Sequence, residues 1–410
     1  MNAETSLDIE QIRKSFPILQ EKVNGKPLIY LDNAATTQKP TVVIKALSDY
    51  YTNSNANIHR GIHSLAEKAT AAFEATRTAL QLFLGAAERE EVIFTKGTTD
   101  SINLVAATYG KANVSKGDEI IISQLEHHSN IVPWQLLAEE KQAIIKVIPI
   151  NSIGELDMAA FDKLLSPKTK IVAVNYASNA LGTINPIKEI IEKTHQVGGI
   201  VVIDGAQSTS HIAIDVEALD IDFYALSAHK MYGPTGVGAL YGKRALLEAM
   251  PPYQGGGEMI KEVSFEGTTY ADLPYKFEAG TPNIADVVAF KAAIDFVNEI
   301  GREAILQHEV ELLEYATEQL EQIEGLTIIG KAKEKVGVAS FVIEGVHHQD
   351  LAILLDQEGI AVRTGHHCTQ PLMHCLNILG TTRASFAVYN TKQEIDAFIT
   401  ALHKALKMLR

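Results

Sequence analysis

The sequence predicts an α/β protein built on a mostly parallel sheet flanked by helices, with a smaller α+β domain. Two observations predict this class. Short apolar runs alternate with helical patterns over the first two thirds of the chain. Polar residues follow each apolar run directly, as expected where buried parallel strands end at one edge of a sheet. The C-terminal third then mixes long helical patterns with a few short strands.

The predicted strands of the sheet are apolar on both faces, which favours burial between two helical layers. In chain order they are EVIFT (91–95), EIIIS (119–123), KIVAVNY (170–176), GIVVID (199–204) and DFYALS (222–227). A long helix precedes them over residues 64–85, with Ser64 expected as its N-cap and Gly85 closing it.

The C-terminal third begins with one long helical stretch over residues 289–325. Strands are predicted at 326–330, 338–345 and 360–365, with helices at 348–359 and 391–409. We therefore predict a large domain over residues 26–290 and a small C-terminal domain over 291–410. An N-terminal helical segment, residues 1–25, is expected to pack with the small domain.

Composition excludes several classes of protein. The chain has 410 residues, 46% of them hydrophobic, and a formal net charge of −14, which disfavours binding to nucleic acid or to an anionic membrane. No basic segment followed by an apolar core opens the sequence, and no apolar run approaches the length of a membrane span. With only two cysteines, Cys368 and Cys375, we expect no disulfide framework and a cytoplasmic location.

The polar residues that follow the five strands predict a ligand site. They are Thr98, Thr99, His127, Asn179, Asp204, Gln207, Ser227, His229 and Lys230. A lysine, a carboxylate and a hydroxyl-rich helix start match the needs of pyridoxal phosphate, whose aldehyde forms a Schiff base with lysine and whose ring nitrogen pairs with a carboxylate. His127 is expected to stack on the ring, and Gln207 to contact its phenolic oxygen.

Each of these residues also has an ordinary structural explanation when taken singly. Asp204 and the threonines could cap helices, and Asn179 could belong to a turn. A metal site is a second alternative, because the segment GHHCTQPLMHC holds His366, His367, Cys368, His374 and Cys375. It lacks the distant second pair of ligands that structural zinc sites have, and we expect Cys375 to be a small buried hydrophobe instead.

Five motifs resemble the SufS-like cysteine desulfurases, a branch of the class V aminotransferases with pyridoxal phosphate fold type I and a seven-stranded sheet. They are LEHHSNIVPW, DGAQS, SAHKMYGPTG, RTGHHC and RASFAVYNT, in the same order and over essentially the whole chain. Ala228 stands where many relatives have Gly. The short RTGHHC loop is specific for this branch.

The resemblance implies roles for named residues. Lys230, Cys368 and His127 are catalytic, with Lys230 bonded to the cofactor and Cys368 the nucleophile. Thr98, Thr99, Asp204, Gln207, Ser227, His229 and Thr281 bind the cofactor, with Thr281 reaching the neighbouring subunit of a homodimer. Asn179 and Arg383 hold the substrate carboxylate. Arg363, His59 and Arg60 line the entrance.

The resemblance implies that L-cysteine becomes L-alanine, with its sulfur taken up by Cys368 as a persulfide. The sulfur would pass to an acceptor protein of the SufE type for iron–sulfur cluster assembly. L-Selenocysteine as substrate, another class V lyase or an aminotransferase remain alternatives. A non-catalytic sulfur-trafficking scaffold is disfavoured, because it would not need Lys230, Asp204 and Cys368 together.

Overall fold

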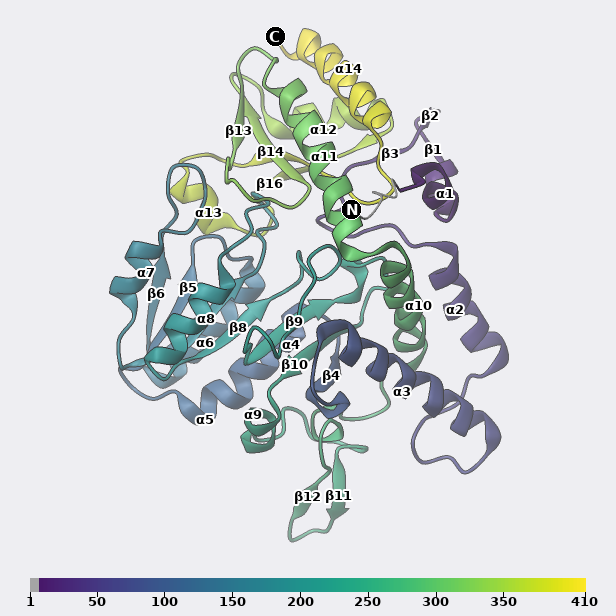
Figure 1. Cartoon of the computed structure of the whole chain (residues 1–410), viewed down its shortest axis with the longest axis vertical. Coiled ribbons are helices and arrows are strands. Elements are labelled where there is room, and N and C mark those ends of the chain that lie inside the picture. The colour runs from purple at the N-terminus through teal and green to yellow at the C-terminus, as the bar shows by residue number, and fades with distance from the viewer. Residues whose placement is uncertain (1–6) are drawn as a thin grey trace, which may run out of the picture.

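A seven-stranded sheet forms the centre of the computed structural model, which describes residues 7–410 (Figure 1). The strand order is β4-β10-β9-β8-β7-β5-β6. The strands are β4 (Val92–Thr95), β5 (Glu119–Ser123), β6 (Ile144–Ile148), β7 (Thr169–Asn175), β8 (Ile200–Asp204), β9 (Phe223–Ser227) and β10 (Gly238–Gly242). Strand β10 runs antiparallel to both of its neighbours, β4 and β9, and the other pairs of the sheet are parallel. The predicted α/β class with a mostly parallel sheet is confirmed.

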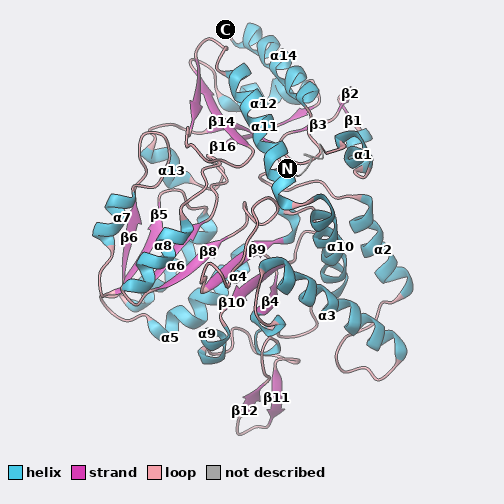
Figure 2. Cartoon of the chain, in the orientation of Figure 1, coloured by secondary structure: helices cyan, strands magenta, loops and turns pink. Residues whose placement is uncertain are grey.

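Helices cover both faces of this sheet (Figure 2). They are α2 (Thr41–Asn53), α3 (Ser64–Leu84), α4 (Thr98–Val105), α6 (Val132–Lys141), α7 (Met158–Leu164), α8 (Ile187–Gln196), α9 (Arg244–Ala249) and α10 (Ile284–Ile300), with the short α5 (Lys111–Asn113). Val172 and Val174 of β7 pack in one apolar cluster with α8 and α10, whereas Ile171 and Ala173 pack in another with α4 and α6. The alternation of side chains along a strand explains the two clusters.

A second, four-stranded antiparallel sheet carries the C-terminal part of the chain. Its order is β13-β14-β17-β16, with β16 at the edge. The strands are β13 (Leu326–Ile329), β14 (Val338–Ile343), β16 (Arg363–Gly365) and β17 (Thr381–Ser385). The helices are α11 (Arg302–Leu320), α12 (His348–Gln357), α13 (Gln370–Cys375) and α14 (Lys392–Leu409). A separate apolar cluster joins α11, α12 and α14 to this sheet.

The N-terminal segment connects the two parts of the fold. Strand β3 (Ile29–Tyr30) pairs with β15 (Ile360–Ala361). Helix α1 (Ile9–Lys14) is tied to α14 by an ion pair of 2.9 Å between Arg13 and Glu394. The predicted domain bounds remain a prediction; the division at residue 290 falls within α10, whose Phe290 packs in the cluster of the large sheet. Residues 1–6 of the predicted N-terminal segment lie outside the described residues.

Several local expectations are corrected. His63, not Ser64, caps α3, since the His63 side chain accepts a hydrogen bond from the amide of Ala66. The stretch 289–325 is two helices, because Gly301 breaks it with a φ of +92°. Strands β6 and β10 were not predicted.

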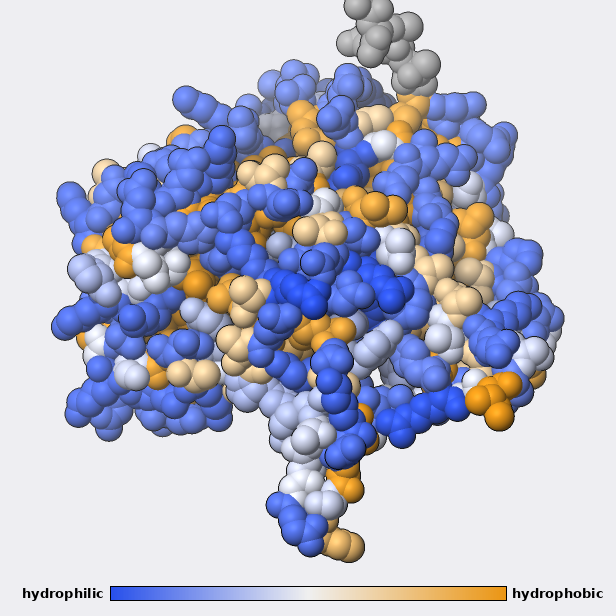
Figure 3. Space-filling view, turned by 60° about the horizontal axis from the view of Figure 1, so that its bottom comes forward, coloured by the Kyte–Doolittle hydropathy of each residue, from blue (hydrophilic) through white to orange (hydrophobic). Residues whose placement is uncertain are grey.

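A small hairpin, β11 (Ile260–Val263) with β12 (Thr268–Tyr270), projects from the body of the molecule (Figures 1 and 3). It exposes Val263, Phe265 and Tyr270. An isolated two-stranded hairpin is only marginally stable. Apolar side chains exposed on it add no burial energy within this chain, and exposed apolar patches of this kind often mark interaction sites. Over residues 7–410, no helix combines the length and the apolar character needed to cross a membrane.

Candidate active site

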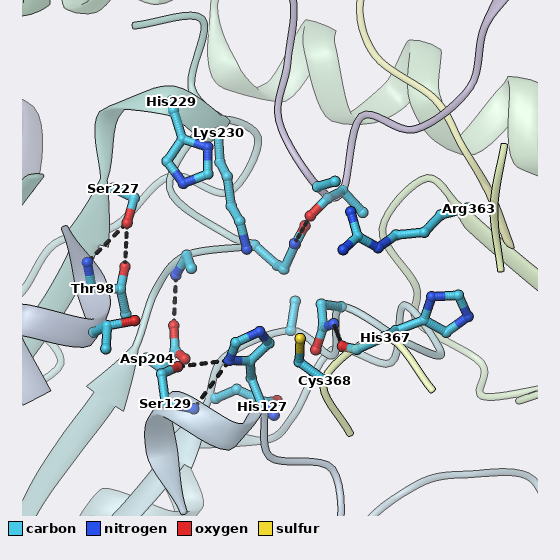
Figure 4. Close-up of a pocket in the computed structure, with 18 of the residues that line it drawn as sticks. Thr98, His127, Ser129, Asp204, Ser227, His229, Lys230, Arg363, His367 and Cys368 are labelled. Carbon is cyan, nitrogen blue, oxygen red and sulfur yellow. Dashed lines mark hydrogen bonds between the residues drawn. The ribbon is translucent and has the colours of Figure 1, made fainter. Parts of the chain in front are cut away.

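A cavity of about 260 Å³ lies at the carboxyl edge of the large sheet, between that sheet and the C-terminal part of the fold (Figure 4). Lys230 enters it from one side and Cys368 from the other. The predicted residues that line it are Thr98, Thr99, His127, Asn179, Asp204, Gln207, Ser227, His229, Lys230, Arg363, Cys368 and Arg383. Parallel strands ending at one edge bring most of these groups together, as the sequence predicted.

Lys230 and Asp204 form the buried polar centre of the cavity. Lys230 ends the short helical turn Ala228–Lys230 directly after β9, and Asp204 ends β8. Burial lowers the pKa of Lys230 to about 8, while the Asp204 carboxylate opposes this shift. Burial also raises the pKa of Asp204. A lysine near this pKa supplies a usable fraction of neutral amine at physiological pH.

His127 stands after β5 with a defined protonation state. Burial and the nearby cation Lys230 lower its pKa to about 3, so the ring is neutral. The amide of Ser129 donates to Nδ1 of His127 at 3.1 Å, which leaves the ring proton on Nε2. A neutral imidazole whose orientation is fixed this way suits stacking against an aromatic ring.

A cup of polar groups lies where β4 and β9 end. The amide of Thr98 donates to Oγ of Ser227 at 2.8 Å, and the Thr98 hydroxyl shares a 2.8 Å hydrogen bond with the same oxygen. Helix α4 begins at Thr98, so its positive end faces the cup. Burial and the neighbouring cation Lys230 lower the pKa of His229 to about 4, so this ring is a neutral donor. Hydroxyls, amides and imidazole at a helix start are typical phosphate donors.

Arg383 lines the cavity and has one donor atom without a hydrogen-bond partner among the described residues. Its side chain is 2% exposed; Nη1 donates to the carbonyl of Asn179 at 2.7 Å and Nη2 to Oδ1 of Asp32 at 2.9 Å. Its Nε is buried and has no hydrogen-bond partner within residues 7–410. Arg363 lies opposite Arg383 in the β16–β17 register, 3.6 Å from the Asp32 carboxylate. A carboxylate entering the cavity would satisfy the orphaned donor.

Cys368 stands in a short loop between β16 and α13. His367 and Cys368 both have left-handed backbones, with φ of +50° and +57°. The amide of His128 donates to the carbonyl of Cys368 at 2.8 Å, and the side-chain amide of Asn179 donates to the carbonyl of His367 at 2.8 Å. The thiol is half-buried and faces the cavity. Asn179 therefore holds the cysteine loop in this structure, a contact that the sequence did not predict.

Three predicted residues lie away from the cavity. Thr281 lines a separate cavity of about 550 Å³. The ring of His59 lies 3.1 Å from the Glu74 carboxylate, and Arg60 forms a 3.1 Å ion pair with Glu258. None of these three side chains lines the cavity around Lys230.

One segment of the site, residues 32–39, was not predicted from the sequence. Asp32 holds Arg383, and the carbonyl of Ala34 accepts a hydrogen bond of 2.6 Å from Gln207. Ala34 and Ala35 line the cavity. The available signal was the run LDNAATTQKP, in which small and polar residues separate a short strand from α2.

The cysteine loop shows no metal site. Within residues 7–410, no group of three or more His, Cys, Asp or Glu is arranged to hold a metal ion. Cys375 is exposed, not buried as expected, with its Sγ 3.5 Å from Oε1 of Gln124. Helix α13 buries Leu372 and Met373, and Cys375 is its last residue, at the surface.

The donors of this cavity fit pyridoxal phosphate. A buried carboxylate suits the ring nitrogen, a buried lysine suits the aldehyde, and the cup around Ser227 suits the phosphate. The orphaned donor of Arg383 remains for an amino-acid carboxylate.

Comparison with known proteins agrees with this reading. Residues 29–398 match the family model described as aminotransferase class-V. The chain is 51% identical over 403 residues to a probable cysteine desulfurase of Vibrio cholerae, covering 98% of this chain and 100% of that protein. It is 52% identical over 397 residues to a cysteine desulfurase of Synechococcus elongatus, covering 97% of this chain and 63% of that protein. The crystal structure of the cysteine desulfurase CsdA of Escherichia coli, in an S-sulfonic acid form, superposes with a TM-score of 0.92 at 40% identity, covering 99% of this chain and 100% of that one. The chain belongs to the class V aminotransferase family.

Proposed function

We propose that this protein is a pyridoxal-phosphate-dependent cysteine desulfurase, which converts L-cysteine to L-alanine and takes the sulfur onto Cys368. The observation that carries this proposal is the position of Cys368, which faces the same cavity as Lys230, Asp204 and Arg383. An aminotransferase has no use for a thiol at that place. The relatives described above bear the name of this activity.

The residues of the cavity divide the work of binding. Thr98, Ser227 and His229 would hold the cofactor phosphate, Asp204 its ring nitrogen and Gln207 its phenolic oxygen. When bound, pyridoxal phosphate withdraws electrons from the α-carbon of the substrate. Arg383 would bind the substrate carboxylate through its free Nε, with Arg363 adding positive charge at the entrance. Lys230, with its pKa of about 8, would take and return a proton at the α-carbon.

The sulfur step balances without an outside oxidant. The thiolate of Cys368 attacks the sulfur of L-cysteine and forms an S–S bond, while the bond between that sulfur and the β-carbon breaks. The electron pair stays on the β-carbon, which takes up a proton and becomes the methyl group of alanine. Cys368 is left as a persulfide, and its sulfur leaves with an acceptor. The thiolate is the reactive form in such a step.

A homodimer would complete the site. Thr281 and His59 do not reach the cavity of their own chain. The molecule also exposes apolar side chains that a partner could cover, among them Phe265 and Ile62. A second copy that brings Thr281 toward the phosphate cup of its neighbour accounts for both observations.

The persulfide acceptor would be a protein of the SufE type that supplies iron–sulfur cluster assembly in the cytoplasm. The thiol of Cys368 is half-buried in a short loop. This supports a protein acceptor, because a protein can also bind the surface around the loop, whereas a small free thiol makes few such contacts. Alanine release that no added acceptor protein accelerates would count against this.

The experiment that tests the proposal follows alanine release from L-cysteine by the pyridoxal-phosphate-loaded protein. The parent should release alanine, Lys230→Ala should neither bond the cofactor nor react, and Cys368→Ala should bind the cofactor but fail with L-cysteine. Full activity of Cys368→Ala on L-cysteine would overturn the persulfide route. Metal content, measured beside it, addresses the alternative at the cysteine loop.

A further inference from the structure

A loop of four residues, Thr36–Lys39, holds the peptide that precedes Lys230. We call it the 36–39 loop. The carbonyl oxygen of His229 accepts from the amide of Thr37 at 3.1 Å and from the hydroxyls of Thr36 and Thr37 at 3.0 and 3.2 Å. The ammonium of Lys39 donates to the same oxygen at 2.9 Å. A carbonyl oxygen has two lone pairs, and four donors within hydrogen-bond distance leave neither of them without a partner. The orientation of this peptide is therefore fixed.

The hydroxyl of Thr37 also reaches the other side of Lys230. It accepts a hydrogen bond of 2.8 Å from the amide of Tyr232, whose backbone is left-handed with a φ of +64°. A tyrosine adopts this conformation only where its surroundings impose it. Thr37 is buried, so these contacts are shielded from water. The Thr37 hydroxyl is therefore hydrogen-bonded on both sides of Lys230, to the carbonyl of His229 and to the amide of Tyr232.

Lys39 adds a half-buried amine to these contacts, without a countercharge in the described part of the chain. Its Nζ donates to the carbonyls of Thr37 and His229, at 2.5 and 2.9 Å. Within residues 7–410 no carboxylate lies within ion-pair distance of it. Burial lowers the pKa of Lys39 to about 7. The two carbonyl oxygens are therefore what holds the Lys39 amine in place beside the His229–Lys230 peptide.

We propose that Thr37 and Lys39 are positioning residues, which set the direction from which Lys230 meets the cofactor aldehyde. Lys230 borders two cavities, the one described above and a small inner one of about 20 Å³ that Thr37 also lines. A rotation of the His229–Lys230 peptide would swing the amine from the first toward the second. The 36–39 loop prevents that rotation. This inference rests on the proposed role of Lys230 with pyridoxal phosphate and does not depend on Cys368.

Two ligands separate positioning from folding. Apoprotein is mixed with pyridoxal phosphate, and bonding to Lys230 is followed by visible absorbance; binding of pyridoxamine phosphate, which has no aldehyde, is measured beside it. Thr37→Val keeps the shape of the side chain but removes its hydroxyl, and should slow bonding about tenfold, as displacements of reacting groups do. It should bind pyridoxamine phosphate within about twofold of the parent, because the phosphate cup is untouched. Thr37→Ser restores the hydroxyl and should restore the rate.

Lys39→Met supplies an independent variant, since methionine keeps much of the length of lysine but has no charge. It should also slow bonding to Lys230 while leaving pyridoxamine phosphate binding in place. An unchanged rate of bonding to pyridoxal phosphate in both variants would overturn the proposal. A loss of pyridoxamine phosphate binding as large as the loss of bonding rate would overturn it too. The desulfurase proposal fails separately, if the parent bonds pyridoxal phosphate but releases no alanine from L-cysteine.

Discussion

Lys230 and Cys368 face one cavity but are held in opposite ways. Lys230 follows β9, which has a neighbouring strand on each side, and the 36–39 loop fixes its backbone. Cys368 follows β16, the edge strand of the small sheet, and sits in a left-handed turn. Interior strands open rarely, whereas loops beside an edge strand open readily. We therefore expect the backbone at Lys230 to stay in one place, and the loop of Cys368 to open more readily.

The largest expected effect breaks the rigid side of this comparison. Asp204→Asn removes the negative charge at the end of β8 and should lower kcat for alanine formation roughly hundredfold, in the range of lost acid–base assistance. The reason is that an amide cannot keep the cofactor ring nitrogen protonated. Steady-state alanine release and the cofactor absorbance spectrum measure it.

A matched control for Asp204 lies on the same sheet. Asp222 is also buried, immediately before β9, where it pairs with His195 and Lys243 instead of facing the cavity. Asp222→Asn should lower Tm but leave kcat near that of the parent. Equal losses of kcat in the two variants would mean that burial of a charge, not its place beside the cofactor, explains the effect.

The second prediction concerns pH and the Lys230 amine. Lys230 is neutral above its pKa of about 8, so the rate at which apoprotein bonds pyridoxal phosphate should rise with pH and level off above about 8. Well below that pH the rate should fall about tenfold per pH unit, in step with the neutral fraction. Asp204 raises the pKa of Lys230, so Asp204→Asn should move the midpoint downward. Stopped-flow absorbance checks both, and a midpoint near 10 would show that Lys230 is not desolvated.

How far the sequence predicts this molecule depends on the surroundings of each segment. The runs at β5 and β8 were recognisable because every residue in them is buried. Strand β6 was not predicted because it is an edge strand with exposed positions. Strand β10 was not predicted because its sequence, GALYG, is short and has a glycine at each end; the strand runs antiparallel to β9. Most residues of the site were predicted because they directly follow predicted strands. Asp32, Thr37 and Lys39 follow none of the large-sheet strands, and only the folded chain brings them back to Arg383 and Lys230.

The third prediction loosens the mobile side. Asn179→Ala removes the hydrogen bond to the carbonyl of His367, and a bond of this kind contributes about 1 kcal/mol, or roughly a fivefold change in an opening equilibrium. Alkylation of Cys368 by iodoacetamide, without substrate, should therefore speed up severalfold. Asn185→Ala is the control, because Asn185 is buried and bonds to Asn175 away from the loop. An alkylation rate equal to that of the parent would show that Asn179 does not hold the loop.

The smallest expected effect concerns the second sulfur of the same region. Cys375 lies seven residues after Cys368, but it is exposed on α13 and outside the cavity. Cys375→Ser should change alanine release less than about twofold and stability by no more than about 0.5 kcal/mol, as for most surface substitutions. Alanine assays and thermal unfolding measure the two. A large loss of activity would mean that the persulfide moves from Cys368 to Cys375 before it leaves, so the mobile side would then have two working sulfurs instead of one.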